Sequence, residues 1–181
     1  MWISEKTKTD TFELDELYWF INKKERSKTR ENTYVMTMIS REPRQIVSFD
    51  VQFNRSAFCL QGIVDNAPDA ERYCTDGYVG YLDVIFPGKH IRNARDKSDT
   101  HISESINADL RHYIPGLKRR SRCFYRSIET FQAVIEVFVD AYNKFGEAKL
   151  KHRVPVIHKA SSQEKHLHKY RDLPFCVIDF L

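Results

Sequence analysis

Hydrophobic and polar residues alternate in three segments near the start of the chain, a period of two that is typical of β-strands. The segments cover residues 12–20, 33–40 and 45–53. A charged stretch joins the first segment to the second as a hairpin loop or a disordered excursion, and Glu42-Pro43-Arg44 makes a turn between the second and third. Three strands with short connections predict an antiparallel meander.

Beyond this meander, helix-like and strand-like segments alternate in the order helix, strand, short helix and strand: residues 56–67, 72–75, 78–85 and 89–92. Ser56 is the expected N-cap of the helix, and Pro68 ends it. The strand ends at Asp76-Gly77, a turn signal in which we expect the glycine to let the chain turn sharply.

Two amphipathic helices complete the predicted domain. Apolar residues recur every three or four positions in the first helix, at Ile102, Ile106, Leu110 and Tyr113. The second helix begins after Ser127 and has the same spacing at Ile128, Phe131, Ile135, Phe138, Tyr142 and Phe145. Gly146 stands where a C′ glycine is expected and predicts the end of this helix.

This order of elements predicts an α/β domain of the ribonuclease-H-like class. Its mixed sheet would have three antiparallel strands and then shorter parallel strands, flanked by helices. The 181 residues are enough for one such domain. We place the domain at residues 12–147, after a polar leader at 1–11 and before a basic tail at 148–181.

The composition excludes several classes of protein. No apolar run approaches the roughly 20 residues of a membrane span, and the N-terminal sequence is not typical of a signal peptide. We therefore expect a cytoplasmic chain without a membrane partner. The four cysteines are widely scattered without a C-x-x-C pair, so no structural zinc site is expected from them, and Cys59 and Cys74 are expected to be small core residues.

Basic residues gather in one stretch of the chain. The net charge is only +4, but residues 110–126 contain no acidic residue and supply six positive charges: Arg111, Lys118, Arg119, Arg120, Arg122 and Arg126. Such a stretch is typical of a nucleic-acid binder. A solvated basic loop explains the stretch alone equally well.

Three acidic residues lie where this architecture could bring them together. Asp15 lies in the middle of the first strand, Asp76 closes the fourth strand, and Glu104 lies in the first turn of a helix. Asn107 and Arg111 share the helix face of Glu104 and could reach phosphate. Carboxylate oxygens suit Mg²⁺, with Mn²⁺ as a possible substitute, and a pair of such ions promotes phosphoryl transfer. The alternative is a set of ordinary surface acids and helix caps.

Other candidate residues have simpler interpretations. Glu16 lies on the opposite strand face from Asp15 and could support the metal ligands. His166 and His168 with Cys176 could bind a metal, but a solvated basic tail is the better interpretation. The indoles of Trp2 and Trp19 are expected to be packing residues rather than base-stacking surfaces.

Four segments of the chain resemble the insertion-sequence-one family of bacterial transposases: Phe12–Leu17, Tyr73–Tyr78, His101–Arg111 and Leu117–Ser127. The resemblance runs from about residue 12 to residue 145. Its most specific part is a helix with the pattern Glu-x-x-Asn-x-x-Leu-Arg, followed by a basic stretch, Phe-x-x-Ser and a long helix.

The resemblance implies a ribonuclease-H-like fold and an Asp-Asp-Glu triad, whose roles fall by position to Asp15, Asp76 and Glu104. It also implies cleavage of double-stranded DNA at element ends, strand transfer into target DNA, and a homo-oligomer on the DNA. Family members usually carry an N-terminal zinc-binding and helix-turn-helix region, whereas this sequence begins almost at the core. We therefore expect a truncated or downstream reading-frame product. A plain nuclease and a non-catalytic DNA-binding remnant stay open as alternatives.

Overall fold

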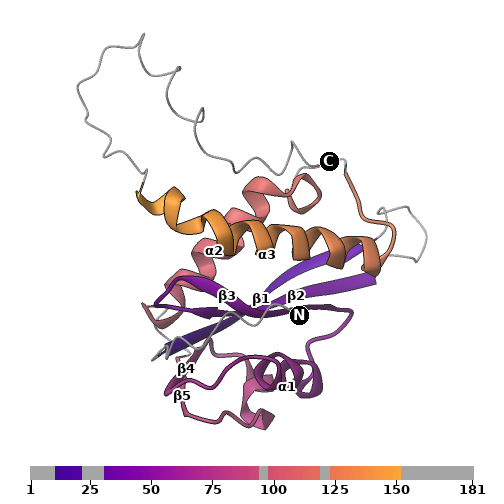
Figure 1. Cartoon of the computed structure of the whole chain (residues 1–181). Coiled ribbons are helices and arrows are strands. Elements are labelled where there is room, and N and C mark those ends of the chain that lie inside the picture. The colour runs from indigo at the N-terminus through magenta and orange to yellow at the C-terminus, as the bar shows by residue number, and fades with distance from the viewer. Residues whose placement is uncertain (1–10, 22–30, 94–97, 119–122, 152–181) are drawn as a thin grey trace.

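The computed structural model describes residues 11–21, 31–93, 98–118 and 123–151. Its five strands form one mixed sheet in the order β3-β2-β1-β4-β5 (Figure 1). The strands are β1 (Thr11–Ile21), β2 (Glu31–Ser40), β3 (Gln45–Gln52), β4 (Arg72–Thr75) and β5 (Lys89–Arg92). The helices are α1 (Ala57–Asp65), α2 (His101–Tyr113) and α3 (Ile128–Lys151), with short 3₁₀ turns η1 (Val79–Asp83), η2 (Ser98–Thr100) and η3 (Pro115–Leu117).

The strand directions divide the sheet into two parts. Strands β1, β2 and β3 pair antiparallel, as the alternating segments predicted. Strand β4 pairs parallel with β1, and β5 pairs parallel with β4. The predicted α/β class, with antiparallel strands followed by shorter parallel strands and flanking helices, is therefore confirmed.

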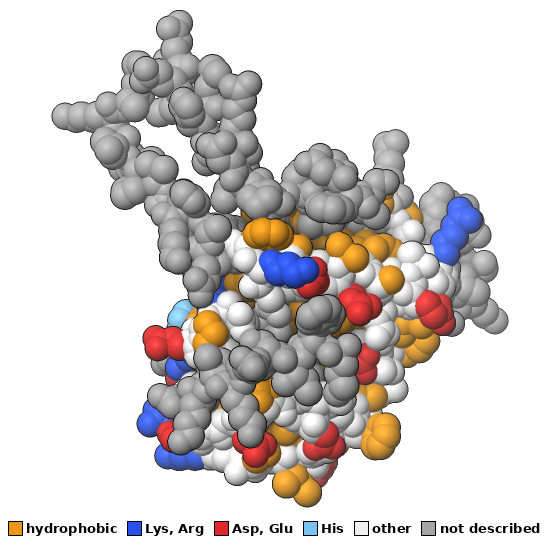
Figure 2. Space-filling model, in the orientation of Figure 1, with side chains coloured by type: hydrophobic (Ala, Val, Ile, Leu, Met, Phe, Trp, Pro, Cys, Tyr) orange, Lys and Arg blue, Asp and Glu red, His pale blue; other side chains and the backbone are white. Residues whose placement is uncertain are grey.

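Helices α2 and α3 lie over one face of the sheet and α1 lies on the other (Figure 1). Each face carries its own hydrophobic core. On β1, Phe12 and Leu14 face α1, whereas Leu17, Trp19 and Ile21 pack with α2 and α3. On the side of the sheet that carries α1, several large hydrophobic side chains stay exposed, among them Phe58, Leu82 and Ile85. Figure 2 shows hydrophobic side chains exposed at the lower end of the molecule. Among the described helices, none combines the length and the apolar character that crossing a membrane requires.

The predicted end of the last helix is wrong. Helix α3 continues through Gly146 to Lys151 instead of stopping at the glycine. A single glycine in a helix costs only about 1 kcal/mol relative to alanine. The residues after it, from Glu147 to Leu150, include alanine, lysine and leucine, which favour helix. The preference of these neighbours for helix therefore outweighs the cost of the glycine, and the helix continues through it.

Helix α3 also completes the edge strand of the sheet. The Asn143 side chain accepts a hydrogen bond from the Ile46 N–H at 2.8 Å and donates one to the Ile46 carbonyl at 2.9 Å. The Asn143 side chain thus pairs with backbone groups of the edge strand β3 that no neighbouring strand could pair with. This pair of hydrogen bonds attaches α3 to β3 through the backbone as well as through the core.

Helix α2 is attached to the central strand by a buried carboxylate. The Glu13 side chain is fully buried, and its Oε2 accepts hydrogen bonds from the Ile102 and Ser103 N–H groups, each at 2.9 Å. Its Oε1 accepts from Nε of Arg41 at 2.8 Å. These contacts satisfy two backbone donors that a helix start leaves unpaired, and they place a negative charge at the positive end of α2.

We expect Glu13→Ala to lower the free energy of unfolding by about 3 kcal/mol, because it leaves a partly buried guanidinium and two backbone donors without their acceptor. Urea unfolding at neutral pH measures this loss. The matched control is Glu42→Ala in the exposed turn after β2, which should change stability by less than about 0.5 kcal/mol. Equal effects of the two variants would contradict the anchoring role of Glu13.

Candidate active site

The parallel pairing of β1 and β4 brings two of the predicted acids together. The last paired residues are Leu14 and Thr75, so the next residue of each chain segment is an aspartate, Asp15 and Asp76. Paired residues of neighbouring parallel strands lie side by side. The two carboxylates therefore lie at the point where β4 ends beside the continuing central strand.

Helix α2 adds the other side chains of the predicted site. The Asn107 side chain donates a hydrogen bond through Nδ2 to Oδ2 of Asp15 at 2.8 Å. Glu104 lies one turn earlier on the same side of the helix and is exposed. The helix thus presents an amide to the buried aspartate and a carboxylate to the surface beside it.

The charges of the three acids act on one another. Burial, together with the negative charges of Asp76 and Glu104, raises the pKa of Asp15 to about 6, although hydrogen bonds from the Glu16 N–H and Asn107 act in the opposite direction. The Glu16 N–H donates to Oδ1 of Asp15 at 2.9 Å. The triad predicted from the sequence therefore forms one electrostatic cluster centred on Asp15.

A local turn orients the second aspartate. Oδ1 of Asp76 accepts a hydrogen bond from the Tyr78 N–H at 2.8 Å, which is an Asx turn. The side chain of Arg92 donates to the Gly77 carbonyl from the end of β5. None of the described glycines has a positive φ, so the expected sharp turn at Gly77 does not use the left-handed conformation. The Asx turn reverses the chain instead.

Glu16 lies beside this cluster on the other face of β1, as the strand period predicted. Its side chain is only 3% exposed, with Oε2 at 3.7 Å from Nη1 of Arg55. Burial, together with the charges of Asp15 and Asp76, raises the pKa of Glu16 to about 7, although the nearby Tyr81 hydroxyl and Arg55 act in the opposite direction. Neither Glu16 Oε1 nor the Tyr81 hydroxyl completes a hydrogen bond. Glu16 therefore adds a poorly compensated carboxylate to the site.

The donor atoms of the cluster suit a hard divalent cation. The carboxylates of Asp76 and Glu104 act electrostatically on Asp15, and the buried Oδ1 of Asn107 beside Asp15 has no hydrogen-bond partner. On the other face of β1, the buried Oε1 of Glu16 has none either. Within the described ranges, however, no three acidic, histidine or cysteine side chains are arranged to hold one metal ion. A bound cation would therefore have to draw the carboxylates closer together.

The predicted DNA contacts are only partly within the described chain. Asn107 is 6% exposed and contacts Asp15, so it lies inside the cluster rather than on an open surface for phosphate. Arg111 is half-buried on α2, while Lys118 and Arg126 are exposed. The other candidates lie outside the described residues: Arg119, Arg120, Arg122, Trp2, His166, His168 and Cys176. Trp19 is buried in the core, which confirms its predicted packing role.

No sequence pattern distinguishes Glu13, Arg55 or Tyr78 as functional residues. Glu13 looked like any polar residue of an alternating strand, and only its burial against α2 distinguishes it. Arg55 and Tyr78 come from separate loops and meet only in the folded chain, where the Arg55 guanidinium lies 3.8 Å from the Tyr78 ring centroid. Spacing along the sequence carries no signal for such a contact.

Comparison with known proteins does not identify the chain. No family model matches it, and no curated protein matches it either. The resemblance to the insertion-sequence-one transposases therefore stays a prediction from the sequence motifs.

The raised pKa values predict how stability changes with pH in metal-free buffer. Because the pKa of Asp15 is about 6 and that of Glu16 about 7, the folded chain keeps protons that the unfolded chain releases above about pH 4. The contribution of these groups to stability should fall as the pH rises from about 4 to about 7 and then level off. In the double variant Asp15→Asn, Glu16→Gln this fall should be smaller by roughly 2–4 kcal/mol.

Urea unfolding at a series of pH values measures the difference between parent and variant. The matched control changes two exposed acids, Asp83→Asn and Glu136→Gln, and should keep the profile of the parent. A fall in stability between about pH 4 and pH 7 that is as steep in the double variant as in the parent would contradict the prediction that burial raises the pKa of the two carboxyls.

Proposed function

We propose that the chain is the catalytic core of a DNA transposase with a ribonuclease-H-like fold. The observation that carries the proposal is the cluster of Asp15, Asp76 and Glu104, with Asn107 hydrogen-bonded to Asp15. The strand order β3-β2-β1-β4-β5 also supports it, because three antiparallel strands followed by parallel strands are expected of that fold. Perturbed carboxyl pKa values in such a cluster are typical of functional sites.

In this proposal, Asp15, Asp76 and Glu104 hold a pair of Mg²⁺ ions, for which Mn²⁺ could substitute. When bound, the ions would neutralise the charge that develops on the phosphate and lower the pKa of the attacking water. The chain's own polar groups prepare the ligands: Asn107 orients Asp15, and the turn at Tyr78 orients Asp76. Fixed ligand orientation of this kind contributes to metal affinity.

The proposed reaction has two transfers on double-stranded DNA. Water attacks the phosphodiester at an element end, the P–O bond breaks, and a 3′-hydroxyl is released as the water proton passes to solvent. That hydroxyl then attacks a phosphodiester of the target DNA in the same manner. Both steps use the same clustered carboxylates, and joining two element ends implies a homo-oligomer on the DNA.

In this proposal, the basic stretch holds the DNA backbone. It follows α2, the helix that carries Glu104 at its start and Arg111 near its end. Phosphate contacts would come from Arg111, Lys118, Arg119, Arg120, Arg122 and Arg126. Lysine and arginine at phosphates position a duplex without reading its sequence.

Asp76→Asn tests the carboxylate chemistry while preserving the local fold. The amide oxygen of asparagine can still accept the hydrogen bond from the Tyr78 N–H, but it cannot balance a metal charge. We expect Mg²⁺-dependent DNA cleavage to fall by at least about a hundredfold, since losing even an outer partner of a metal ligand costs about 10–100-fold. The control Asp83→Asn, at an exposed position, should cleave like the parent.

Two outcomes would replace the proposal with one of its alternatives. A parent that cleaves but cannot join a pre-cut end to target DNA is a plain nuclease. A parent that binds DNA but neither cleaves it nor gains thermal stability from Mg²⁺ is a non-catalytic remnant. No three side chains of the described residues form a ready metal-binding group, which agrees with this alternative.

Changing Lys118, Arg119, Arg120 and Arg122 to alanine tests the basic stretch. If these residues contact phosphates, the slope of log affinity against log salt should flatten by roughly 0.9 for each contact removed. Binding should weaken about equally for every DNA sequence. Fluorescence anisotropy titrations at several salt concentrations measure the slope, with Lys144→Ala on α3 as the control. An unchanged slope in the fourfold variant would remove the stretch from the DNA interface.

A further inference from the structure

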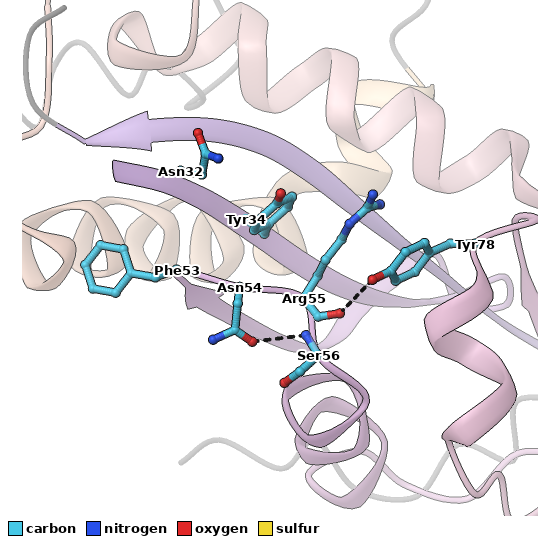
Figure 3. Close-up of a pocket in the computed structure, with 7 residues that line it drawn as sticks. All are labelled: Asn32, Tyr34, Phe53, Asn54, Arg55, Ser56 and Tyr78. Atoms are coloured by element: carbon cyan, nitrogen blue, oxygen red, sulfur yellow. Dashed lines mark hydrogen bonds between the residues drawn. The ribbon is translucent and has the colours of Figure 1, made fainter. Parts of the chain in front are cut away.

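A cleft of about 450 Å³ opens on the face of the sheet that carries α1 (Figure 3). Its walls come from β2, from the segment that joins β3 to α1, and from the turn after β4. The side chains that shape it are Asn32, Tyr34, Phe53, Asn54, Arg55 and Tyr78. Such a volume lies within the range of small-molecule pockets, about 300–1,000 Å³.

Aromatic rings and one arginine form the inner part of the cleft. The Arg55 guanidinium lies 3.8 Å from the ring centroid of Tyr78 and 5.5 Å from that of Tyr34 (Figure 3). The Phe53 ring stands at the mouth and is 44% exposed. Nη1 of Arg55 forms an ion pair with Oε2 of Glu16 at 3.7 Å. The cleft thus combines a positioned cation with ring faces.

The amide side chains of the cleft are oriented to donate. Oδ1 of Asn54 accepts from the Ser56 N–H at 3.0 Å, and Oδ1 of Asn32 accepts from the Tyr18 hydroxyl at 2.9 Å. Because each amide oxygen has a partner, the amide nitrogens are the groups left to bind a ligand. Together with Arg55 they favour a ligand rich in acceptors, such as a phosphate or the edge of a base.

The cleft adjoins the candidate active site at two points. Tyr78 is the residue whose N–H binds the carboxylate of Asp76, and Arg55 pairs with Glu16, the neighbour of Asp15 along β1. The Tyr78 hydroxyl donates to the Arg55 carbonyl at 3.2 Å, which joins the two walls. The cleft and the carboxylate cluster are therefore connected through Tyr78 and Arg55.

We propose that this cleft binds an unpaired nucleotide of the DNA substrate, with its base against Tyr34 and Phe53 and its acceptors toward Arg55. Aromatic rings bind any base through its face, so the site needs an unstacked base rather than a particular sequence. A peptide-binding groove is a poorer match, because no aliphatic side chain lines the described walls. The inference rests on the proposed function for its DNA partner.

Paired DNA probes test the proposal without cleavage. The full chain, in EDTA, is titrated with a blunt duplex and with the same duplex carrying a short unpaired thymine run at one end that includes the fluorescent base aminopurine. We expect roughly tenfold tighter binding of the probe with the unpaired end, and a change in aminopurine fluorescence on binding, since one base–aromatic stack is worth a factor of about 5–150.

Side-chain variants then locate the effect. Tyr34→Leu and Phe53→Leu remove ring faces but keep apolar volume, so each should reduce the preference for the unpaired end about threefold or more while leaving blunt-duplex affinity unchanged. Tyr34→Phe keeps the ring and should keep the preference. Phe145→Leu on α3, with a comparably exposed ring, is the matched control and should also keep it.

The outcomes separate this inference from the proposed function. Equal binding of both probes by the parent would overturn the cleft proposal, as would a preference that survives in both Tyr34→Leu and Phe53→Leu. A preference that these variants abolish supports the cleft even if the chain fails to cleave DNA in Mg²⁺, a failure that would affect only the proposed catalysis.

Discussion

The buried carboxylate of Glu13 determines where α2 lies on the sheet, and the candidate site depends on that placement. Glu13 binds the start of α2 at Ile102 and Ser103. The rise per residue of the strand and of the helix then determines which residues of β1 and α2 meet further along. Two residues along a strand advance about 6.6 Å, and four residues along a helix advance about 6 Å. Asp15 therefore meets Asn107, as their hydrogen bond shows. Two residues further on, Leu17 joins the core that contains Leu110.

Three acids on β1, Glu13, Asp15 and Glu16, have different electrostatic environments. The difference distinguishes the structural carboxylate of Glu13 from the candidate functional carboxylates of Asp15 and Glu16. Glu13 has a guanidinium and two helix N–H groups as partners, so its charge is compensated although it is fully buried. Asp15 and Glu16 are mostly buried with fewer partners, and burial raises the pKa of each. A fold designed only for stability would replace such residues with apolar ones. Their retention is understandable if a cation or a substrate compensates them.

Much of the fold could be predicted from the sequence because its elements are periodic. The alternation in β1 and the stripe of α3 each specify an element and the face that it buries. The end of α3 could not be predicted from Gly146, since the cost of one glycine is smaller than the combined preference of its neighbours. The order of the strands depends on the pairing of β1 with β4, which lie far apart in the chain.

The site was predictable to the extent that it depends on strand ends and helix faces. Asp15, Asp76 and Glu104 were placed by those two rules. Asn107 was expected to reach phosphate, but its side chain is buried and donates a hydrogen bond to Asp15. Glu13 depends on partners 28 and 89 residues away, a separation at which local pattern carries no signal.

The period of two along β1 gives the site two sides. Asp15 faces α2 and the carboxylate cluster, whereas Glu16 faces α1 and holds Arg55 at the cleft. The two faces of a sheet are normally separated by its strands, but β4 ends at Thr75, beside this point of β1. Beyond that end, the turn at Asp76 and Tyr78 borders both sides. Under the proposed function, a DNA strand that crosses the end of β4 would place a phosphate at the cluster and its neighbouring base in the cleft. That arrangement requires the two strands of the duplex to separate there.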